Sequence, residues 1–418
     1  MAKTQYARIN EQGEIVLPPH LARELGISPG DEIRIEPNGH GMYVHPPVHT
    51  LKRVYVELTN RCNLNCSTCM RNVWDVEYGH MSMELFEQIL ANLDKAPERP
   101  ELFLGGYGEP LSHPKVLSMI ELAKGRGYRV SLITNGILLT EPIAQRMIDL
   151  NLDMLWVSLD GASAECYTDV RLGDLLPLIL ENLTCLRGLK YQKFGISVWS
   201  GYPKLGIAFV AMQRNIHDLA DVIRLGSRLG AVEFSVSNVL AHDADLLEEN
   251  LYMRSLDLVA GQEIRPVVHM PMMDIQPKTL QALGDVMKDL NQLELTGSPL
   301  HRNIDMCPFV ERGSISVRWD GKVSPCLPLL YTHTHYLGDR ERVSREYFVG
   351  DVREKDLIEI WNNPEYRTLR KRLQDFDFSP CAFCNSCEMA VDNIEDCFGN
   401  VHPTCGGCLW SKGLIRCP

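Results

Sequence analysis

From residue 52 onward, short apolar runs alternate with longer segments in which apolar residues recur at helical spacing. Such runs predict strands, and the segments between them predict helices. The strand-like runs are Val54–Leu58, Leu102–Leu104, Arg129–Thr134, Met154–Ser158, Gly206–Val210 and Val232–Val239, and the helical segments include Ser82–Leu93, Lys115–Arg126, Glu141–Leu150 and Ile216–Leu229. Six repeats predict an α/β fold with a parallel sheet and outer helices. Because six strands are too few for an eight-stranded barrel, we expect a partial, open (β/α)6 barrel with active residues at the carboxyl ends of its strands.

The regions that flank this barrel, which we place at residues 52–245, have other patterns. Residues 1–48 read as a strand, a turn at Glu11 to Gly13, a second strand, a short helix that ends near Gly26, and a final alternating strand. Residues 246–300 look like a helical connection. Residues 301–418 contain short irregular segments around cysteines, and such a region is expected to need metal to hold its shape.

Composition and charge restrict the classes of function. The chain has 418 residues and a formal net charge of −12, which argues against broad binding to nucleic acid or anionic membranes. Its N-terminus is too polar for a signal peptide, and no apolar run approaches the roughly 18 residues of a membrane span. We therefore expect a cytoplasmic protein, in which 14 cysteines indicate metal or redox ligands rather than disulfides.

Three thiols follow the first strand of the barrel, as Cys62-x3-Cys66-x2-Cys69. A structural zinc site needs four ligands, and the next cysteine, Cys166, lies nearly a hundred residues further on. Three thiolates suit a [4Fe–4S] cluster in which one iron lacks a protein ligand and can bind a cofactor directly. The isolated Cys166 and Cys185 are expected to be small buried hydrophobic residues.

This motif, placed after the first strand of a β/α barrel, resembles the radical S-adenosylmethionine (SAM) superfamily. The resemblance implies that the methionine part of SAM chelates the open iron and that its reductive cleavage yields a 5′-deoxyadenosyl radical, which abstracts hydrogen from a substrate. It also implies cofactor contacts from "GGYGEP" after the second strand, "TNG" after the third, "SLDG" after the fourth and "AMQRN" after the fifth. The candidate cofactor-binding residues are Gly106, Gly108, Glu109, Asn135, Ser158, Asp160, Met212 and Asn215. Thr68 stands where the family often has an aromatic residue before the third cysteine.

A second group of nine cysteines lies near the C-terminus: Cys307, Cys326, Cys381, Cys384, Cys387, Cys397, Cys405, Cys408 and Cys417. Nine thiols exceed the eight that two fully ligated [4Fe–4S] clusters need. The opening Cys307-x13-Gly321-x4-Cys326 resembles the SPASM extension of radical SAM enzymes, which carries one or two auxiliary clusters. A zinc ribbon from Cys381, Cys384, Cys405 and Cys408 is the alternative. His333 and His335 are expected in an exposed loop, or else facing the substrate as a base.

Residues 1–48 resemble the SpoVT/AbrB swapped-hairpin fold in "GEIVLP", "LGI" and "GDEI". That family often binds DNA as a dimer. Residues 1–48 contain four basic and six acidic residues, and this balance is unfavourable for phosphate contacts. We therefore expect the segment to form a homodimer or to dock a partner, with DNA unlikely.

The whole arrangement resembles the radical SAM maturases that accompany tungsten-cofactor aldehyde oxidoreductases. This resemblance implies a protein, peptide or cofactor-precursor substrate and an electron donor such as ferredoxin or flavodoxin. One alternative is a maturase of a ribosomal peptide, and an alternative of another class is a DNA-binding iron–sulfur redox sensor. The methionine-binding elements, Glu109 and Asp160 among them, speak against a sensor. No general base is identified.

Overall fold

A computed structural model describes most of the chain. The described residues are 6–37, 42–163, 174–195, 201–253, 267–268, 276–281, 284, 294–295, 298–299, 305–384 and 387–418. Cys166, which we expected to be buried, lies outside them. Cys185 lies within them, on an outer helix, and is half-buried.

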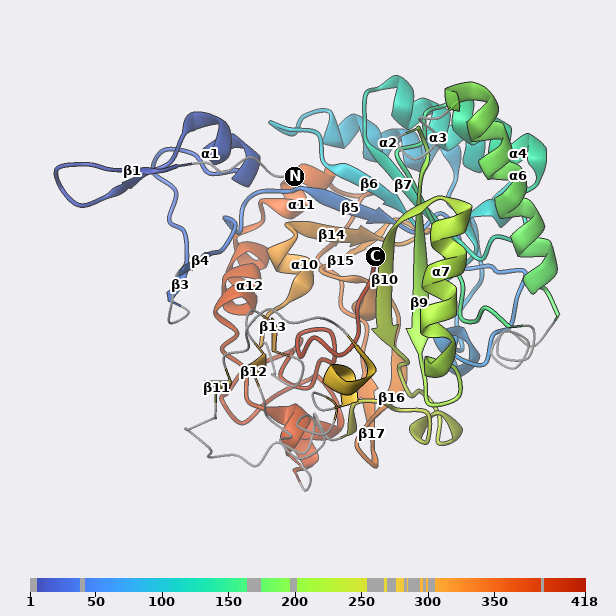
Figure 1. Ribbon diagram of the computed structural model, residues 1–418. Helices are drawn as coiled ribbons and strands as arrows, with labels where there is room; N and C mark the ends of the chain where they lie inside the picture. The colour runs from blue at the N-terminus through green and yellow to red at the C-terminus, as the bar shows by residue number, and fades with distance from the viewer. Residues whose placement is uncertain are drawn as a thin grey trace.

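The barrel predicted from the alternating pattern is present. Six parallel strands pair in chain order: β5 (Arg53–Val56), β6 (Glu101–Leu104), β7 (Val130–Thr134), β8 (Met154–Ser158), β9 (Lys204–Ala211) and β10 (Ala231–Asn238). The helices α2 (Met83–Leu93), α3 (Val116–Gly125), α4 (Glu141–Asp149), α6 (Leu176–Phe194) and α7 (Leu219–Leu229) lie on its outer side (Figure 1). The partial α/β barrel is thus confirmed.

The sequence explains these elements locally. Strand β8 is buried at its first four residues because both faces are covered, as is usual in a parallel sheet. Helix α2 starts where the Ser82 hydroxyl accepts a hydrogen bond from the Leu85 amide at 3.1 Å. Helix α7 stops at Gly230, whose φ of 98° few other residues adopt. Because the barrel strands are parallel, their carboxyl ends and the loops that follow them lie at the same edge of the sheet.

The sheet does not stop at the barrel. Strand β14 (Ser314–Val317) pairs in parallel with β5, with Ile315 opposite Val54, and β15 (Lys322–Ser324) and β18 (Gly350–Asp351) follow it. The β14–β15 hairpin turns at Gly321, which has a φ of 97°. The sheet therefore has nine strands, and the cysteine-rich region is joined to the barrel by backbone hydrogen bonds.

The C-terminal region has more apolar pattern than we expected. Residues such as Val317, Ile360 and Leu369 belong to the same buried core as the barrel strands. Its further elements are α10 (Pro308–Glu311), η6 (Leu327–Leu330), β16 (His333–Leu337), β17 (Arg340–Ser344), α11 (Leu357–Trp361), α12 (Pro364–Asp375), η7 (Cys381–Phe383) and η8 (Glu388–Val391). Only its last part, from about residue 379, consists of loops and short turns.

The segment at 246–300 also differs from the expected helical connection. Its described residues include one short helical stretch at 277–281 and three two-residue strands, β11 (Val267–Val268), β12 (Glu294–Leu295) and β13 (Ser298–Pro299). Short 3-10 turns complete the elements: η1 (Met70–Val73), η2 (Pro110–Ser112), η4 (Ile216–Asp218) and η5 (Asp245–Leu247). In the described part of the chain, no helix is both long and apolar enough to span a bilayer.

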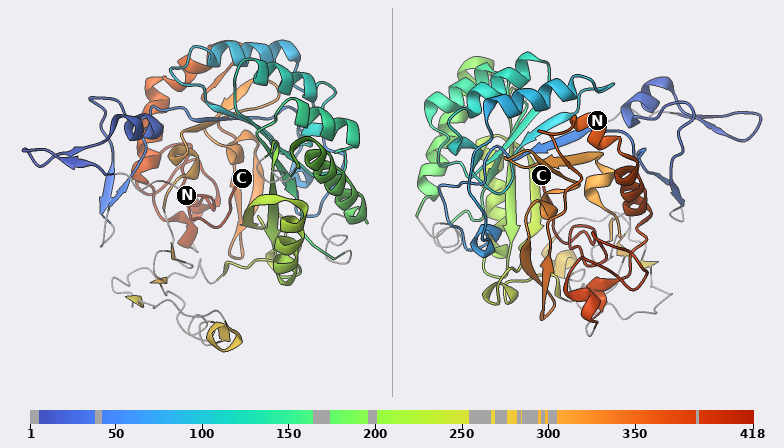
Figure 2. Two further views of the ribbon diagram at one scale, coloured as in Figure 1. Left: turned by 45° about the horizontal axis from the view of Figure 1, so that its top comes forward. Right: turned by 180° about the vertical axis from the view of Figure 1, so that it is seen from behind.

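The N-terminal unit projects from the body of the molecule (Figures 1 and 2). The expected elements are found as the hairpin of β1 (Arg8–Ile9) and β2 (Ile15–Val16), the helix α1 (Pro19–Leu25), which ends at Gly26, and the pair β3 (Ile35–Pro37) and β4 (Met42–Val44). The AbrB-like fold stays a prediction. His45, which follows β4, is buried, with Nδ1 2.9 Å from a Glu311 carboxylate oxygen.

Candidate active site

A cavity of about 310 Å³ lies at the carboxyl edge of the barrel strands. The loops after successive strands line it, and so do the end of β10 and the last residues of the chain. Of the residues predicted from the sequence, Cys62, Cys66, Cys69, Gly106, Gly108, Glu109, Asn135, Ser158 and Asp160 line this cavity. The fold thus brings together nine residues that are spread over about a hundred positions.

The loop after β5 places its three thiols by local hydrogen bonds. The Cys69 amide donates to the Cys66 carbonyl at 3.1 Å, and the Asn72 side chain donates to the same carbonyl at 2.9 Å. Burial raises the pKa of the Cys62 and Cys69 thiols. Bound iron would supply the positive charge that stabilises their thiolates, so this loop fits a metal cluster.

The glycines after β6 let the backbone pass very close to other groups. A Cβ at Gly106 would lie 2.6 Å from the Glu57 side chain, and one at Gly108 would collide with the Thr59 carbonyl. These glycines are therefore needed for the course of the loop itself, apart from any approach to a ligand.

Glu109 is buried at the floor of the cavity, with 3% of its surface exposed. One carboxylate oxygen accepts from the Thr134 hydroxyl at 2.8 Å and from the Leu111 amide at 2.9 Å, and the other accepts from the Asn135 amide at 2.7 Å. These donors fix the carboxylate in orientation and connect the loops after β6 and β7.

Met212 and Asn215 do not line the cavity. The Asn215 side chain donates to the Asp160 carbonyl at 3.0 Å and accepts from the Met212 amide at 2.8 Å, and the Asp160 carboxylate accepts from the Val210 amide at 2.8 Å. Asn215 therefore does not line the cavity itself but holds the backbone of Asp160, which does. Met212 packs in a separate apolar cluster.

The far wall of the cavity comes from residues that sequence analysis missed. Trp410, Ile415 and Arg416 line it from the end of the chain. This tail is fixed to β10, where the Asn238 side chain donates to the Leu414 carbonyl at 2.8 Å, and it reaches β5, where Arg53 donates to the Pro418 carbonyl at 3.2 Å. It thus crosses the open side of the partial barrel. Its sequence carries no signal for this position.

A separate chamber lies in the C-terminal region. Four of the predicted cysteines line it: Cys307, Cys326, Cys405 and Cys408. Burial raises the pKa of Cys307 to about 12 and holds that of Cys326 well above its usual value, and the neighbouring thiols add to both shifts. Residues from α10, β15 and the 405–408 loop thus converge there, although they are a hundred positions apart.

The other C-terminal cysteines gather elsewhere. Burial raises the pKa of Cys384, and the nearby thiols of Cys381, Cys387 and Cys397 raise it further. The four cysteines of the zinc alternative are thus divided, because two of them line the chamber and two belong to this outer group. In the described part of the chain, no three His, Cys, Asp or Glu residues are placed to hold a single metal ion.

Comparisons with known proteins agree with this division of the chain. Residues 56–204 match the model of the radical SAM superfamily, and residues 307–388 match the SPASM model, an iron–sulfur cluster-binding domain. The tungsten-containing aldehyde ferredoxin oxidoreductase cofactor-modifying protein of Pyrococcus furiosus is 30% identical over 372 residues, which are 88% of this chain and 97% of that protein. The chain belongs to the radical SAM superfamily.

Shorter matches point to the same superfamily. The AdoMet-dependent heme synthase of Methanosarcina barkeri is 30% identical over 43% of this chain and 48% of its own. The mycofactocin maturase MftC of Mycobacterium tuberculosis is 29% identical over 42% of this chain and 41% of its own. SuiB of Streptococcus suis, solved with its precursor peptide SuiA, has a similar fold, with a TM-score of 0.51 at 13% identity, over 80% of this chain and 70% of that chain. This radical SAM protein is an enzyme whose cofactors are SAM and [4Fe–4S] clusters.

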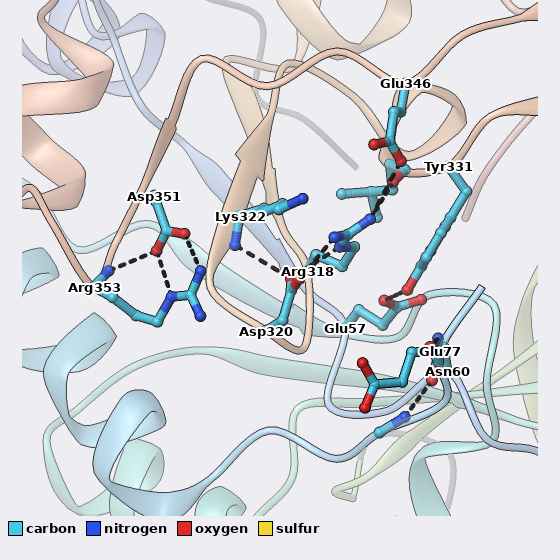
Figure 3. Close-up of polar contacts among 12 residues, drawn as sticks. Glu57, Asn60, Glu77, Arg318, Asp320, Lys322, Tyr331, Glu346, Asp351 and Arg353 are labelled. Carbon is cyan, nitrogen blue, oxygen red and sulfur yellow. Dashed lines mark hydrogen bonds and ion pairs between the residues drawn. The ribbon is translucent and has the colours of Figure 1, made fainter.

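The radical SAM barrel and the C-terminal region meet at a buried carboxylate, Glu57 (Figure 3). Its two oxygens accept from the Tyr331 hydroxyl at 2.5 Å and from the Tyr107 amide at 3.2 Å. Complete burial raises the pKa of Glu57 to about 7, although these hydrogen bonds and the charge of Arg318 lower it. Tyr107 lines the cofactor cavity, while Tyr331 lines a second, polar cleft of about 820 Å³. Sequence analysis missed Glu57 because a lone glutamate in a strand pattern gives no signal.

Proposed function

We propose that this radical SAM enzyme reductively cleaves SAM to a 5′-deoxyadenosyl radical and abstracts hydrogen from a substrate during maturation of a tungsten-cofactor oxidoreductase. The observation that carries the proposal is the nearly full-length match to the P. furiosus cofactor-modifying protein, together with a cavity that holds the three thiols and Glu109. The matches to MftC and to the heme synthase cover less than half of the chain, so they give less support to a reaction like that of either enzyme. A peptide substrate, such as the precursor peptide SuiA with which SuiB was solved, is the alternative.

In the cofactor cavity, Cys62, Cys66 and Cys69 hold a [4Fe–4S] cluster and leave one iron for SAM. When bound, the cluster supplies the electron and SAM supplies the radical. The carboxylate of Glu109, held by three donors, accepts from the ammonium group of SAM in a charge-assisted hydrogen bond. Gly106 and Gly108 let the loop after β6 pass close to Glu57 and the Thr59 carbonyl, and this path brings Glu109 to the cavity.

The remaining cavity residues orient the other parts of SAM. Asn135 donates to the Asn63 side chain at 2.8 Å, which joins the cluster loop to the loop after β7. Ser158 and Asp160 hold the ribose and sulfonium region, since both line the cavity after β8. Asn215 keeps Asp160 in position from behind.

The C-terminal cysteines hold two further [4Fe–4S] clusters. Cys307, Cys326, Cys405 and Cys408 hold the cluster of the chamber, and Cys381, Cys384, Cys387 and Cys397 hold an outer one. Cys417 is then the ninth, spare thiol. Cys397 is exposed at the surface, so the outer cluster is the point at which a ferredoxin or flavodoxin donor approaches.

Replacing Cys62, Cys66 and Cys69 together by alanine tests the proposal. Anaerobically reconstituted variant protein should lose about four iron atoms per chain and should form no 5′-deoxyadenosine from SAM. The matched control is Cys185→Ala, on the outer helix α6, which should keep both. Undiminished iron content or 5′-deoxyadenosine formation in the triple variant would overturn the assignment. The substrate class is tested by offering deuterated candidates and following deuterium into 5′-deoxyadenosine.

A further inference from the structure

Two buried nitrogen-bearing side chains face the cysteine chamber from one hairpin. His335 on β16 and Arg342 on β17 are directly opposite each other in the strand register. Only 3% of His335 and 2% of Arg342 are exposed, and both line the chamber with its four cysteines. Residues opposite each other on one face of a hairpin have neighbouring side chains, so the two act at the same place. The expectation that His335 lies in an exposed loop was therefore wrong.

The His335 ring has hydrogen-bonding capacity that the protein does not use. Among the described residues, its buried Nδ1 atom has no hydrogen-bond partner. Burial, followed by the nearby His333 and Arg342, holds the pKa of His335 well below its usual value, so the ring is neutral. A neutral imidazole protonated at Nδ1 is a donor, and a buried donor without an acceptor is unfavourable. With the ring proton on Nδ1, the orphan atom is a donor that fits an acceptor inside the chamber.

Arg342 is placed against the loop that carries two of the four thiols. A Cβ at Gly407 would lie 2.8 Å from the Arg342 guanidinium carbon, so the glycine between Cys405 and Cys408 makes room for this cation. One of its N–H groups donates to the Ala390 carbonyl. A guanidinium has five N–H donors, and a buried cation needs anionic neighbours. Four thiolates with a cluster provide them.

We propose that His335 and Arg342 donate N–H hydrogen bonds to the sulfur atoms of the chamber cluster and make this cluster easier to reduce. The inference rests on the cluster assignment proposed above. An added electron increases the negative charge on sulfur, and donors and a cation stabilise that charge, so both side chains favour the reduced state. Trp410 lines both the chamber and the cofactor cavity, so this cluster is the one beside the cofactor cavity.

The test is an anaerobic redox titration followed by electron paramagnetic resonance, in the Cys62/Cys66/Cys69→Ala background, which leaves only the C-terminal clusters. His335→Leu removes the ring donor, and the reduction equilibrium of the chamber cluster should fall about tenfold, which is 59 mV for one electron. Arg342→Met should lower it at least as much, and Arg342→Lys should recover part of the loss because the charge is kept. In His335→Leu the signal of the outer cluster should stay unchanged.

Thr334→Val is the matched control, since Thr334 is the neighbour of His335 on β16 but lies on the other face of the hairpin. Full iron content with an unshifted chamber signal in both His335→Leu and Arg342→Met overturns the inference while the cluster assignment survives. A parent protein with iron for only one C-terminal cluster overturns both. Strong hyperfine coupling from ¹⁵N-labelled histidine would make His335 a ligand and would likewise overturn its role as a donor.

Discussion

The barrel and the last forty residues both carry cysteines for clusters, but they are stabilised in different ways. Strands of the barrel are fully buried at residues such as Leu104 and Leu132, and the three-thiol loop is a short addition to that core. Residues 379–418 carry seven of the nine C-terminal cysteines, yet their described part contains only the short 3-10 helices η7 and η8. The barrel therefore has a core of its own without metal, whereas we expect the C-terminal loops to depend on thiol ligation for their shape.

Removing iron should make residues 379–418 lose their structure while the barrel stays folded. With an anaerobic chelator, the buried thiols of Cys326 and Cys405, whose pKa values burial raises well above normal, become neutral and have no metal to join their segments. Limited proteolysis with mass spectrometry should then show rapid cleavage between residues 379 and 418. The barrel should resist cleavage and keep its helical circular dichroism. Equal protection of both regions in apo and holo protein would contradict the comparison.

The difference between the barrel and the C-terminal region also explains which features could be predicted from the sequence. The barrel strands and the site residues from Cys62 to Asp160 follow a local rule, because each loop comes directly after its strand. Other features join segments that are remote in the sequence: the pairing of β14 with β5, the grouping of Cys307 with Cys405, and the tail across the open barrel. The periodicity of apolar residues does not predict such contacts. Burial of His335 was missed for the same reason, since "THTHY" alternates equally well in an exposed hairpin and a buried one.

Glu57, where the barrel and the C-terminal region meet, should make the stability of the protein depend on pH. The pKa of Glu57 in the folded protein, about 7, lies above its ordinary value of 4.5, so the folded state binds more protons between these two pH values. Stability therefore falls as pH rises from about 4.5 to about 7 and is level above that, by roughly 3 kcal/mol in total. Relative to the parent, Glu57→Gln should gain roughly 1 kcal/mol in unfolding free energy between pH 6 and pH 8.

Chemical denaturation of both proteins at several pH values measures this difference. Tyr331→Phe provides a second check, because loss of its hydrogen bond should raise the pKa of Glu57 and move the window to higher pH. A difference between parent and Glu57→Gln that does not vary with pH would show that Glu57 keeps one ionisation state.

Glu109 tests the local site without disturbing the metal. A hydrogen bond from an ammonium group to a carboxylate is worth about 1.5–3 kcal/mol. Glu109→Gln should therefore weaken SAM binding roughly tenfold or more, measured by anaerobic calorimetry, with full iron content. The control is Glu121→Gln, an exposed carboxylate on α3 that pairs with Arg146. Equal affinity in Glu109→Gln and parent would move the ammonium site elsewhere.

The N-terminal unit is a third case, with neither a large core nor cysteines. Its strands leave large apolar side chains exposed, and Tyr6 and Ile9 reach 82% and 66%. The other exposed ones are Ile15, Val16, Ile35, Met42 and Tyr43. A segment of this size alone buries little surface, so a second copy of the chain is the occupant we propose for these strands, as a homodimer through residues 1–48.

Deleting residues 1–44 should therefore give a monomer that binds and cleaves SAM like the parent. The deletion stops at residue 44 because the next residues are bonded to the body, where the Pro46 carbonyl accepts from Gln374 and the His49 carbonyl accepts from Trp361. Anaerobic size-exclusion chromatography with light scattering measures the mass of both proteins. Ile9→Glu with Val16→Glu should also dissociate the dimer without any truncation. A full-length protein that is already monomeric would refute the proposed dimer, and submicromolar binding to duplex DNA at physiological salt would assign the unit to DNA instead.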